Sequence, residues 1–449
     1  MSAPSPSAAL ARFAAETPTE AIPPALRDLA RRSVTSALAA GIAGRRDPDA
    51  AAMLRVLTRL SGPARAGVIA GGPQLDVTRA AFANAMLCNL LDFDDTHAPT
   101  ILHPTAPVLG AVTALAEDLG TAPAEAMTAF TLGCEVACRL ADAVSPEHYR
   151  RGWHITATTG ALGAALAAAR LLGLDARRSL WALGHATAQA SGTVETLGTM
   201  AKSTGVGNAA QAGVLAALMA AEGVAGPETP LEGPRGYLRL VTDRPDLEGL
   251  ARGLGQDWSF ARNMPKPYPC GVVLNPVIEA ALALRADLGA AAIARIEIAG
   301  CQLLLDRTDR PLARLPRDLQ VCAQHCVSAA LLRGRFGPAE VDAEAAADPQ
   351  IAALRTRVGP MVADPGFTVD GARVTLWLED GRTLSRSIDE AEGSPGRPLG
   401  DAALAAKLRA QCRDPADAEA LLTALSGIWS EVPLSALTGP GGDPAGNRT

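Results

Sequence analysis

The chain has 449 residues, of which 48% are hydrophobic, 20% are charged and 3% are aromatic. This apolar content excludes intrinsic disorder for most of the chain, and the length is enough for two or three domains with a large core. The formal net charge of −6 argues against a nucleic-acid-binding protein, because such proteins need a dense basic surface to neutralise phosphates.

Membrane and disulfide-rich classes are also disfavoured. No stretch reaches the ~18 uninterrupted apolar residues of a membrane-spanning helix. The first residues lack the basic start and apolar run of a secretory signal. The eight cysteines contain no CxxC pair, so neither a zinc ribbon nor an iron–sulfur cluster is indicated. We therefore expect a cytoplasmic protein with no membrane or nucleic-acid partner.

The cations are almost all arginine. Of the 41 Lys and Arg residues, three are lysine: Lys202, Lys266 and Lys407. Arginine does not replace lysine where a compact, flexible ammonium is needed. These three positions therefore deserve individual inspection.

Up to about residue 260 the chain is predicted to be helix after helix. Alanine-rich runs at 106–118, 124–142 and 208–222 predict closely packed helices. Another helix is predicted from about Thr158 to Leu172, because Gly173 suits a left-handed C-terminal cap and Asp175 can cap the next helix.

From about residue 266 the pattern changes. Residues 294–300 alternate apolar and polar side chains, and 372–388 do so on both sides of Asp380-Gly381, a strong hairpin signal. A helix is predicted between these strands, and helix returns after residue 400. We predict a mainly α protein: a large all-helical domain of residues 1–265 plus 400–449, an inserted smaller α+β lid domain of 266–399, and a disordered tail at 438–449.

The densest polar cluster is Leu91-Asp92-Phe93-Asp94-Asp95-Thr96-His97, followed by His103. Three carboxylates in four residues are costly to bury unless they are protonated, paired or bound. Solvated capping aspartates are one interpretation. A divalent metal site is another, although further carboxylates at helical spacing are not seen. The DxDDT pattern also occurs in class II terpene cyclases, but this chain has too few aromatic residues to shelter a carbocation.

Three further segments could carry chemistry. His154 precedes small hydroxyl residues that begin a helix, which suits a neutral imidazole that transfers protons, although a structural histidine is the alternative. Met200–Asn208 places a lysine, hydroxyls and glycines before a predicted helix, as in an anion cradle, but it is not a P-loop. Lys266-Pro267-Tyr268-Pro269-Cys270-Gly271 lies at the predicted domain junction.

Together these segments resemble the MmgE/PrpD family, which includes 2-methylcitrate dehydratase, cis-aconitate decarboxylase and iminodisuccinate epimerase. The resemblance runs in order through DFDDTH…HPT, GWHITATTGALGAALAAARLLGL, SGTVE…MAKSTGVGNAAQAG, KPYPCG and GSPGRPL, and so covers nearly the whole chain. It implies a helical domain with a lid-like α+β domain, a homodimer, and no metal or organic cofactor.

The resemblance carries over to particular residues. Asp92, Thr96, His103, His154 and Lys202 stand where members such as cis-aconitate decarboxylase have active-site residues. The chain also departs from the family. Gly205 replaces a histidine that many members have, the run from Gly271 to Asn275 lacks the usual histidines, and His325 aligns with a tyrosine position.

The family's reactions make or quench a carbanion beside a carboxylate, so they need preorganised cations and donors. We expect Lys202 to anchor a substrate carboxylate or move a proton, and His103 and His154 to act as general acid and base. Asp92 would fix a histidine tautomer or balance the lysine. Thr96, Lys266, Tyr268 and His325 would bind substrate.

The sequence therefore predicts a cofactor-independent lyase, a dehydratase or decarboxylase, that acts on a small di- or tricarboxylate without a metal. The first alternative is an epimerase or isomerase of a dicarboxylate. The second is a non-catalytic binding protein that kept the fold and lost its chemistry through Gly205, Gly271 and Asn275.

Overall fold

The computed structural model describes residues 5–438, and the chain divides into two compact units. The helical unit contains the chain up to Leu90, then Asp94–Asn263, and resumes at Asp401; the sheet unit contains Leu91–Phe93 and Met264–Gly400. From the sequence we predicted domain boundaries at 265/266 and 399/400. We did not predict that Leu91–Phe93 would group with the sheet unit. Of the tail predicted at 438–449, all but Thr438 lies outside the described residues.

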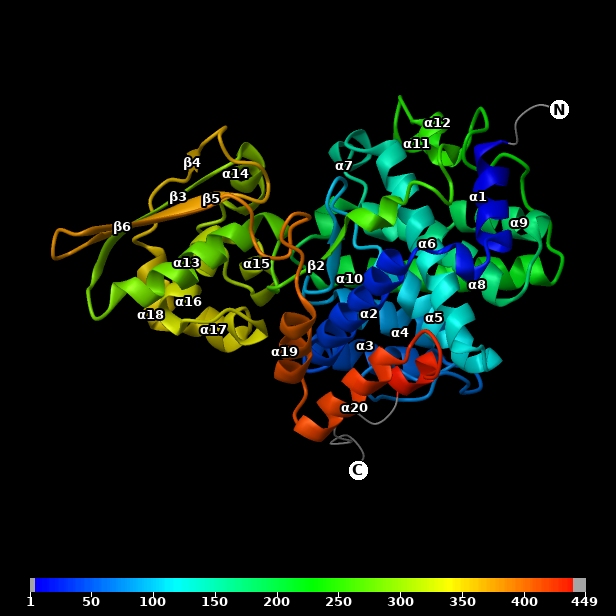
Figure 1. Cartoon of the computed structure of the whole chain (residues 1–449), viewed down its shortest axis with the longest axis horizontal. Coiled ribbons are helices and arrows are strands. Elements are labelled where there is room, and N and C mark those ends of the chain that lie inside the picture. The colour runs from blue at the N-terminus through cyan, green and yellow to red at the C-terminus, as the bar shows by residue number, and fades with distance from the viewer. Residues whose placement is uncertain (1–4, 439–449) are drawn as a thin grey trace. The chain divides into compact units, whose positions relative to one another are not determined.

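The helical unit is built from helices of very different lengths (Figure 1). Those before the sheet unit are α1 (Pro6–Glu16), α2 (Pro24–Gly44), α3 (Pro48–Leu60), α4 (Val77–Asn89), α5 (Thr105–Leu119), α6 (Pro123–Val144), α7 (Glu147–Arg150), α8 (Ile155–Leu171), α9 (Ala176–Thr187), α10 (Met200–Ala221), α11 (Tyr237–Val241) and α12 (Leu247–Ala251). After the sheet unit the chain adds α19 (Asp401–Gln411) and α20 (Pro415–Ser426). The short strand β1 (Asp95–His97) also lies in this unit, and β2 (Asn263–Pro265) begins at the last residue before the sheet unit.

Helix α10 is central to the helical unit. It packs against α8, α4 and α9, and α8 packs in turn against α6 and α5. By length and composition α10 is apolar enough to cross a membrane, but more than half of its most apolar window is buried inside the protein. A core helix of a folded domain has the same property, so the packing accounts for the composition.

Several local sequence signals are confirmed. Helix α8 is followed by Gly173 in the left-handed conformation, with φ +65°. The next helix is capped by Asp175, whose carboxylate accepts a hydrogen bond of 2.8 Å from the Arg178 N–H. The prediction of a mainly α protein is also confirmed, because helices dominate the described elements.

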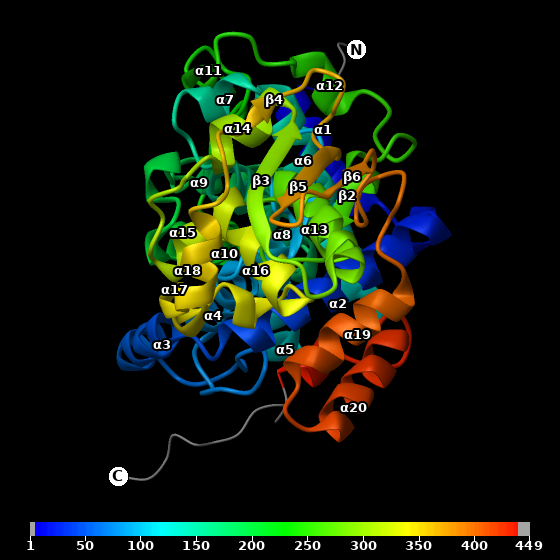
Figure 2. The same ribbon diagram turned by 90° about the vertical axis from the view of Figure 1, so that its left-hand side faces the viewer.

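The sheet unit combines a four-stranded sheet with helices (Figure 2). Its helices are α13 (Asn275–Leu288), α14 (Gln302–Thr308), α15 (Pro316–Leu319), α16 (Ala323–Arg333), α17 (Ala343–Ala347) and α18 (Pro349–Arg355). Its strands are β3 (Ile293–Gly300), β4 (Val362–Ala363), β5 (Ala372–Leu378) and β6 (Thr383–Ile388). The spatial order is β4-β3-β5-β6, in which only the β3–β4 pair is parallel.

The predicted hairpin forms as expected. Strands β5 and β6 are antiparallel, with Thr375 opposite Ser385, and Gly381 turns the chain at φ +87°. Alternate residues of β5 are buried, because α13 packs against β5 and β6 while α16 packs against α13. This unit therefore has its own hydrophobic core, separate from that of the helical unit.

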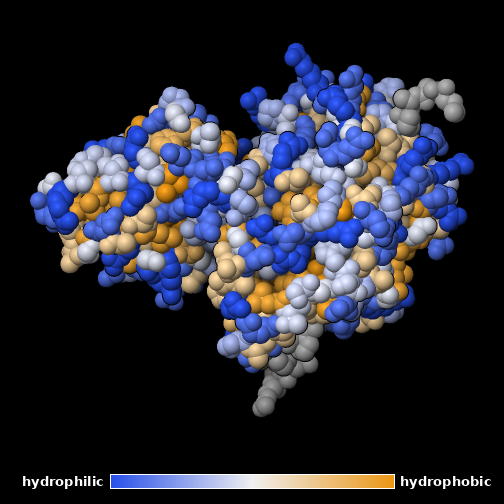
Figure 3. Space-filling view, viewed as in Figure 1, coloured by the Kyte–Doolittle hydropathy of each residue, from blue (hydrophilic) through white to orange (hydrophobic). Residues whose placement is uncertain are grey.

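The molecular surface is mixed. The face shown in Figure 3 carries hydrophobic residues in small groups between hydrophilic ones. The most exposed large hydrophobic side chains of the described residues are Leu312 and Leu315, which share one loop of the sheet unit, and Leu240 and Leu60 of the helical unit. Isolated apolar residues of this kind are ordinary on a folded protein.

Candidate active site

The central feature of the helical unit is a buried pair between a carboxylate and an imidazole. Asp94 lies just before β1, and His103 lies in the turn between β1 and α5. Asp94 Oδ1 and His103 Nδ1 are 2.9 Å apart, and the two residues are 0% and 7% exposed. Because an ionised carboxylate can only accept hydrogen bonds, Nδ1 must carry the hydrogen. Nε2 is then the basic nitrogen of the His103 imidazole.

Both members of this pair are held by further contacts. Asn89, the last residue of α4, donates from Nδ2 to Asp94 Oδ2 at 3.2 Å. The main-chain N–H of His103 donates to Thr156 Oγ1 on α8 at 3.1 Å. Thr156 lies two residues after His154, the N-cap residue of α8, which is buried. The fold therefore brings His103 and the helix end that carries His154 together.

Lys202 lies in a helix, which corrects one prediction. The Met200–Asn208 segment was expected to be a glycine-containing loop that precedes a helix, but α10 already begins at Met200. Thr199 caps this helix, and its Oγ1 accepts a hydrogen bond of 3.2 Å from the Ala201 N–H. Lys202 is therefore in the first turn of α10, half-buried, where main-chain N–H groups of a helix start favour an anion.

The two glycines of this segment serve packing rather than a loop. A side chain at Gly207 would meet Phe82 at 2.7 Å, so this position must stay small for α10 to approach α4. A Cβ atom at Gly205 would meet Ala157 of α8 at 3.7 Å, an ordinary contact. Since Gly205 is one turn after Lys202, this contact also places the start of α10 beside the start of α8, where His154 lies.

A second buried acid lies beside the pair. Asp95 is 0% exposed, and burial followed by the nearby Asp94 charge raises its pKa to about 7. Its Oδ2 accepts hydrogen bonds from Thr105 and from Asn263, the latter at 2.6 Å. The hydroxyl of Thr96 is also buried, and among residues 5–438 it has no hydrogen-bond partner. A buried, unpaired hydroxyl is a group that a bound polar molecule can satisfy.

Two other histidines of the helical unit are structural in character. His97 Nδ1 lies 2.8 Å from Thr100 Oγ1, and Nε2 lies 3.1 Å from the Ser259 carbonyl oxygen. His148 Nε2 lies 3.0 Å from Thr158 Oγ1. Burial lowers the pKa of each imidazole to about 4, so both stay neutral near pH 7.

In the sheet unit, Lys266 forms a compact buried ion pair with Asp92. The Lys266 ammonium is 3.1 Å from Asp92 Oδ1, and it donates to the carbonyl oxygens of Asp92 and Cys270, each at 3.0 Å. Lys266 is 2% exposed, and these three acceptors match the three hydrogens of an ammonium. Asp92 has φ +53°, an uncommon conformation for a residue with a side chain, and Lys266 holds it in place.

The other two candidates of the sheet unit differ in their surroundings. Tyr268 is half-buried and packs edge-on against Phe336, and burial raises its pKa. His325 is fully buried, and its Nε2 lies 2.6 Å from the Glu340 carbonyl oxygen. The Glu340 contact occupies one ring nitrogen of His325, and its predicted role in substrate binding stays a prediction.

The departures from the family pattern also have definite surroundings. Asn275 is buried at the start of α13, where its Oδ1 lies 3.5 Å from Cys270 Sγ. A Cβ atom at Gly271 would meet Val321 at 3.6 Å, an ordinary distance. Where the family pattern has histidines, this chain therefore has the packed amide of Asn275 and two glycines, Gly205 and Gly271, at which a Cβ atom would make only ordinary contacts.

The side chains of Asp94 and His103 are of types that bind divalent metals, but here they are hydrogen-bonded to each other. A metal ion at Asp94 and His103 would have to take the two atoms that form their 2.9 Å hydrogen bond.

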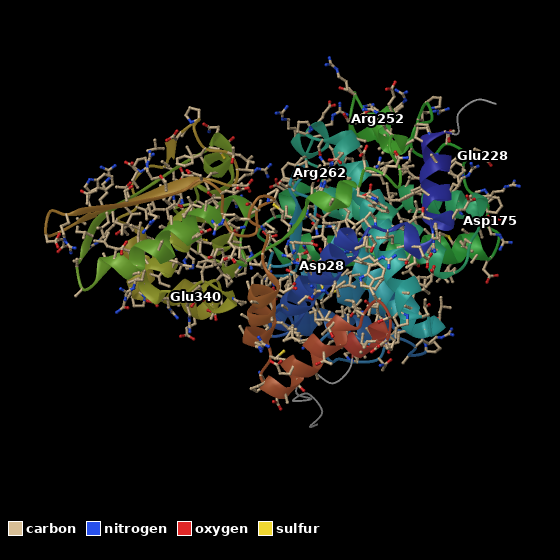
Figure 4. All side chains as sticks on the ribbon, viewed as in Figure 1. Asp28, Asp175, Glu228, Arg252, Arg262 and Glu340 are labelled. Atoms are coloured by element: carbon tan, nitrogen blue, oxygen red, sulfur yellow. The ribbon has the colours of Figure 1, made fainter. Side chains whose placement is uncertain are left out.

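A cavity of about 410 Å³ lies elsewhere in the helical unit, where α6 faces residues 246–262. It is lined mainly by charged residues, among them Arg252 and Arg262 (Figure 4), and by none of the predicted site residues.

Asp94 is a candidate site residue that the sequence analysis did not select. The cluster of three carboxylates was recognised, but only Asp92 was carried over from the family. The signal that could have identified Asp94 is its place directly before a short extended segment that leads to His103. Such a segment can turn back on itself. Here the turn is closed by a main-chain hydrogen bond of 2.7 Å from the His97 N–H to the Leu102 carbonyl oxygen.

The sequence was compared with known families and proteins. The MmgE/PrpD N-terminal domain matches residues 8–250, and the MmgE/PrpD C-terminal domain matches residues 268–426. Cis-aconitate decarboxylase of Mus musculus is 28% identical over 390 residues, covering 81% of this chain and 78% of its own length. Cis-aconitate decarboxylase of Aspergillus terreus is 30% identical over 285 residues, covering 60% of this chain and 58% of its own. 2-Methylcitrate dehydratase of Cupriavidus necator is 31% identical over 140 residues, covering 27% and 28%. The chain therefore belongs to the MmgE/PrpD family.

Proposed function

We propose that the protein is a lyase that removes carbon dioxide or water from a small di- or tricarboxylate. The observation that carries the proposal is the buried Asp94–His103 pair, hydrogen-bonded to the start of α8 where His154 lies. Relatives named as a decarboxylase of cis-aconitate and a dehydratase of 2-methylcitrate support a tricarboxylate as the substrate.

The residues have separable roles in this proposal. Asp94 fixes the His103 tautomer, so that Nε2 faces the reacting carbon as base or, once protonated, as acid. His154, at the start of α8, is the second proton-transfer group. The Lys202 ammonium and the first N–H groups of α10 bind a substrate carboxylate. Thr96 donates a hydrogen bond to substrate, and Lys266 keeps Asp92 in position.

Both candidate reactions balance with these groups. In decarboxylation a C–C bond breaks, carbon dioxide leaves, and the electron pair moves into the conjugated carboxylate system until an acid delivers a proton to carbon. In dehydration the base removes a proton next to a carboxylate, and the hydroxyl leaves as water with a proton from the acid. Positive charge near the carboxylate stabilises the electron-rich transition state in both cases.

The test is turnover of cis-aconitate, 2-methylcitrate and related di- and tricarboxylates in D2O, followed by proton NMR and by carbon dioxide release. The proposal expects one of two results with one of these acids: loss of carbon dioxide with one deuterium incorporated at carbon, or loss of water without such incorporation into the alkene product. Lys202→Ala should abolish turnover, while Arg252→Ala in the separate cavity should leave it unchanged.

Other outcomes would overturn the proposal. Deuterium exchange with inversion, and without loss of water or carbon dioxide, would establish the epimerase alternative. We also propose that the reaction needs no added cofactor, so activity should survive dialysis against EDTA. A loss that Zn²⁺ or Mg²⁺ restores would contradict that part.

A further inference from the structure

Lys407 is a buried lysine that the proposed chemistry leaves without a role. It lies on α19, part of the chain that returns to the helical unit after the sheet unit, and it is 8% exposed. Its Nζ is 2.8 Å from Ser36 Oγ on α2, and Ser36 Oγ is 2.5 Å from the Asp94 carbonyl oxygen. Two hydrogen bonds thus connect the Lys407 ammonium to the main chain of Asp94, whose carboxylate is bonded to His103.

The direction of these hydrogen bonds is determined by chemistry. An ammonium can only donate, so Ser36 Oγ must accept from Lys407. The single hydroxyl hydrogen of Ser36 is then directed to the Asp94 carbonyl oxygen. With Ser36 and Asp94 both 0% exposed, water cannot substitute for either partner without entering the core.

We propose that Lys407 is a positioning residue for the proposed reaction: through Ser36 it fixes the main chain of Asp94 and thereby the orientation of His103. This inference rests on the proposed function. Asp94 is held at its carbonyl by Ser36, while its carboxylate bonds Asn89 and His103. Rotation of the Asp94 peptide would move the carboxylate, and a shift of about 1 Å in a catalytic group can cost about 10²-fold in rate.

The chemistry of lysine suits this place better than that of arginine. Three of the 41 basic residues are lysine, and Lys407 is one of them. The Ser36 hydroxyl matches a point donor on a flexible stem, whereas a planar guanidinium would bring five donors into the same buried space. We therefore expect arginine to fit this position poorly.

The experiment compares kcat and KM for Lys407→Met, Ser36→Ala and the double variant. We expect each single variant to lower kcat about tenfold or more with KM changed less than twofold, because the hydrogen-bond chain touches no substrate. The double variant should be no worse than the more severe single variant, since both interrupt the same chain.

Asp401→Asn is the matched control. Asp401 also joins α19 to α2, through an ion pair of 2.8 Å with Arg31, but on the surface beside Asp28 (labelled in Figure 4). Its kcat should stay within twofold of the unchanged protein. Equal kcat for Ser36→Ala, Lys407→Met and Asp401→Asn, or additive losses in the double variant, would overturn the proposal. If Lys407→Met does not fold, Ser36→Ala decides alone, because it removes one buried oxygen.

A spectroscopic measurement separates this inference from the proposed function. The Nδ1–H proton of His103, assigned by its absence in His103→Gln, should shift in Ser36→Ala and Lys407→Met but not in Asp401→Asn. If that proton shifts while no carboxylate is turned over, the proposed function fails and the positioning link stands. If turnover is found and neither kcat nor the proton responds, the link fails and the function stands.

Discussion

The two aspartates of the Asp92-Phe93-Asp94 segment are nearly adjacent in the chain but are used differently. Asp92 belongs to the sheet unit and pairs with the Lys266 ammonium at 3.1 Å, while Asp94 belongs to the helical unit and pairs with the His103 imidazole at 2.9 Å. One partner is an ammonium whose three hydrogens face Asp92 and two carbonyl oxygens. The other is an imidazole that is bonded to Asp94 through Nδ1.

This difference teaches how one short acidic motif can serve two purposes. The Asp92–Lys266 pair stabilises a strained main-chain conformation, because its lysine also bonds two carbonyl oxygens. The Asp94–His103 pair defines a tautomer, which in the proposed function prepares His103 for proton transfer. We therefore expect the first pair to dominate stability and the second to dominate rate.

Lys266→Met should have the largest effect on stability. Removing one partner of a buried ion pair typically costs about 3–5 kcal/mol, because the other charge is left unpaired. Urea unfolding should show this loss for Lys266→Met and a partial recovery in Asp92→Asn/Lys266→Met. A single variant as stable as the unchanged protein would contradict the structural role of the pair.

His103→Gln should have the next largest effect, and we expect this effect on kcat rather than on stability. Loss of a general acid or base lowers kcat by about 10²–10⁴-fold. The glutamine amide can still donate to Asp94, so the unfolding free energy should change by about 1 kcal/mol or less. Steady-state kinetics and urea unfolding of the same sample test both parts. A large loss of stability with unchanged kcat would reverse the proposed division between the two pairs.

His97→Gln should make the unfolding free energy depend less steeply on pH below about 6.5. The folded pKa of His97 is lowered by burial to about 4, against an ordinary value of 6.5. Between these pH values the unfolded chain binds a proton that the folded protein excludes, so the unfolding free energy falls as pH drops from about 6.5 to 4. Each such histidine contributes about 1 kcal/mol per pH unit in this window. Unfolding at several pH values should show a shallower decline for His97→Gln than for the half-buried control His185→Gln.

His325→Gln should have the smallest effect on catalysis. The imidazole is buried in the sheet unit and is bonded to the Glu340 carbonyl oxygen, so its replacement should lower the melting temperature by a few degrees and leave kcat and KM within about twofold. A KM increase of tenfold without loss of stability would instead return His325 to the substrate-binding residues.

The parts of the fold that depend on local chemistry were predictable from sequence. Gly173, Asp175 and the Asp380-Gly381 turn were read correctly because caps and turns are set by neighbouring residues. The start of α10 was read incorrectly, because glycine normally signals a loop, whereas Gly207 is needed where Phe82 approaches the helix.

The candidate site was predictable only in part for a different reason. His103 and His154 could be proposed from their motifs, but the partner of His103 depends on how β1 turns back. The contact of Lys407 with Ser36 joins residues 371 positions apart, and no local pattern encodes such a pairing. Long-range contacts of this kind are decided by the packing of whole helices.

The discontinuous helical unit has a consequence for synthesis of the protein. Helix α2 is translated before the sheet unit, but α19, which packs against α2, is translated only after the entire sheet unit. At about 5–20 residues per second, Ser36 must wait tens of seconds for Lys407. For that time the nascent chain holds Ser36 without the ammonium that donates to it, so the hydrogen-bond chain from Lys407 to the Asp94 carbonyl oxygen is completed only after the sheet unit has been translated.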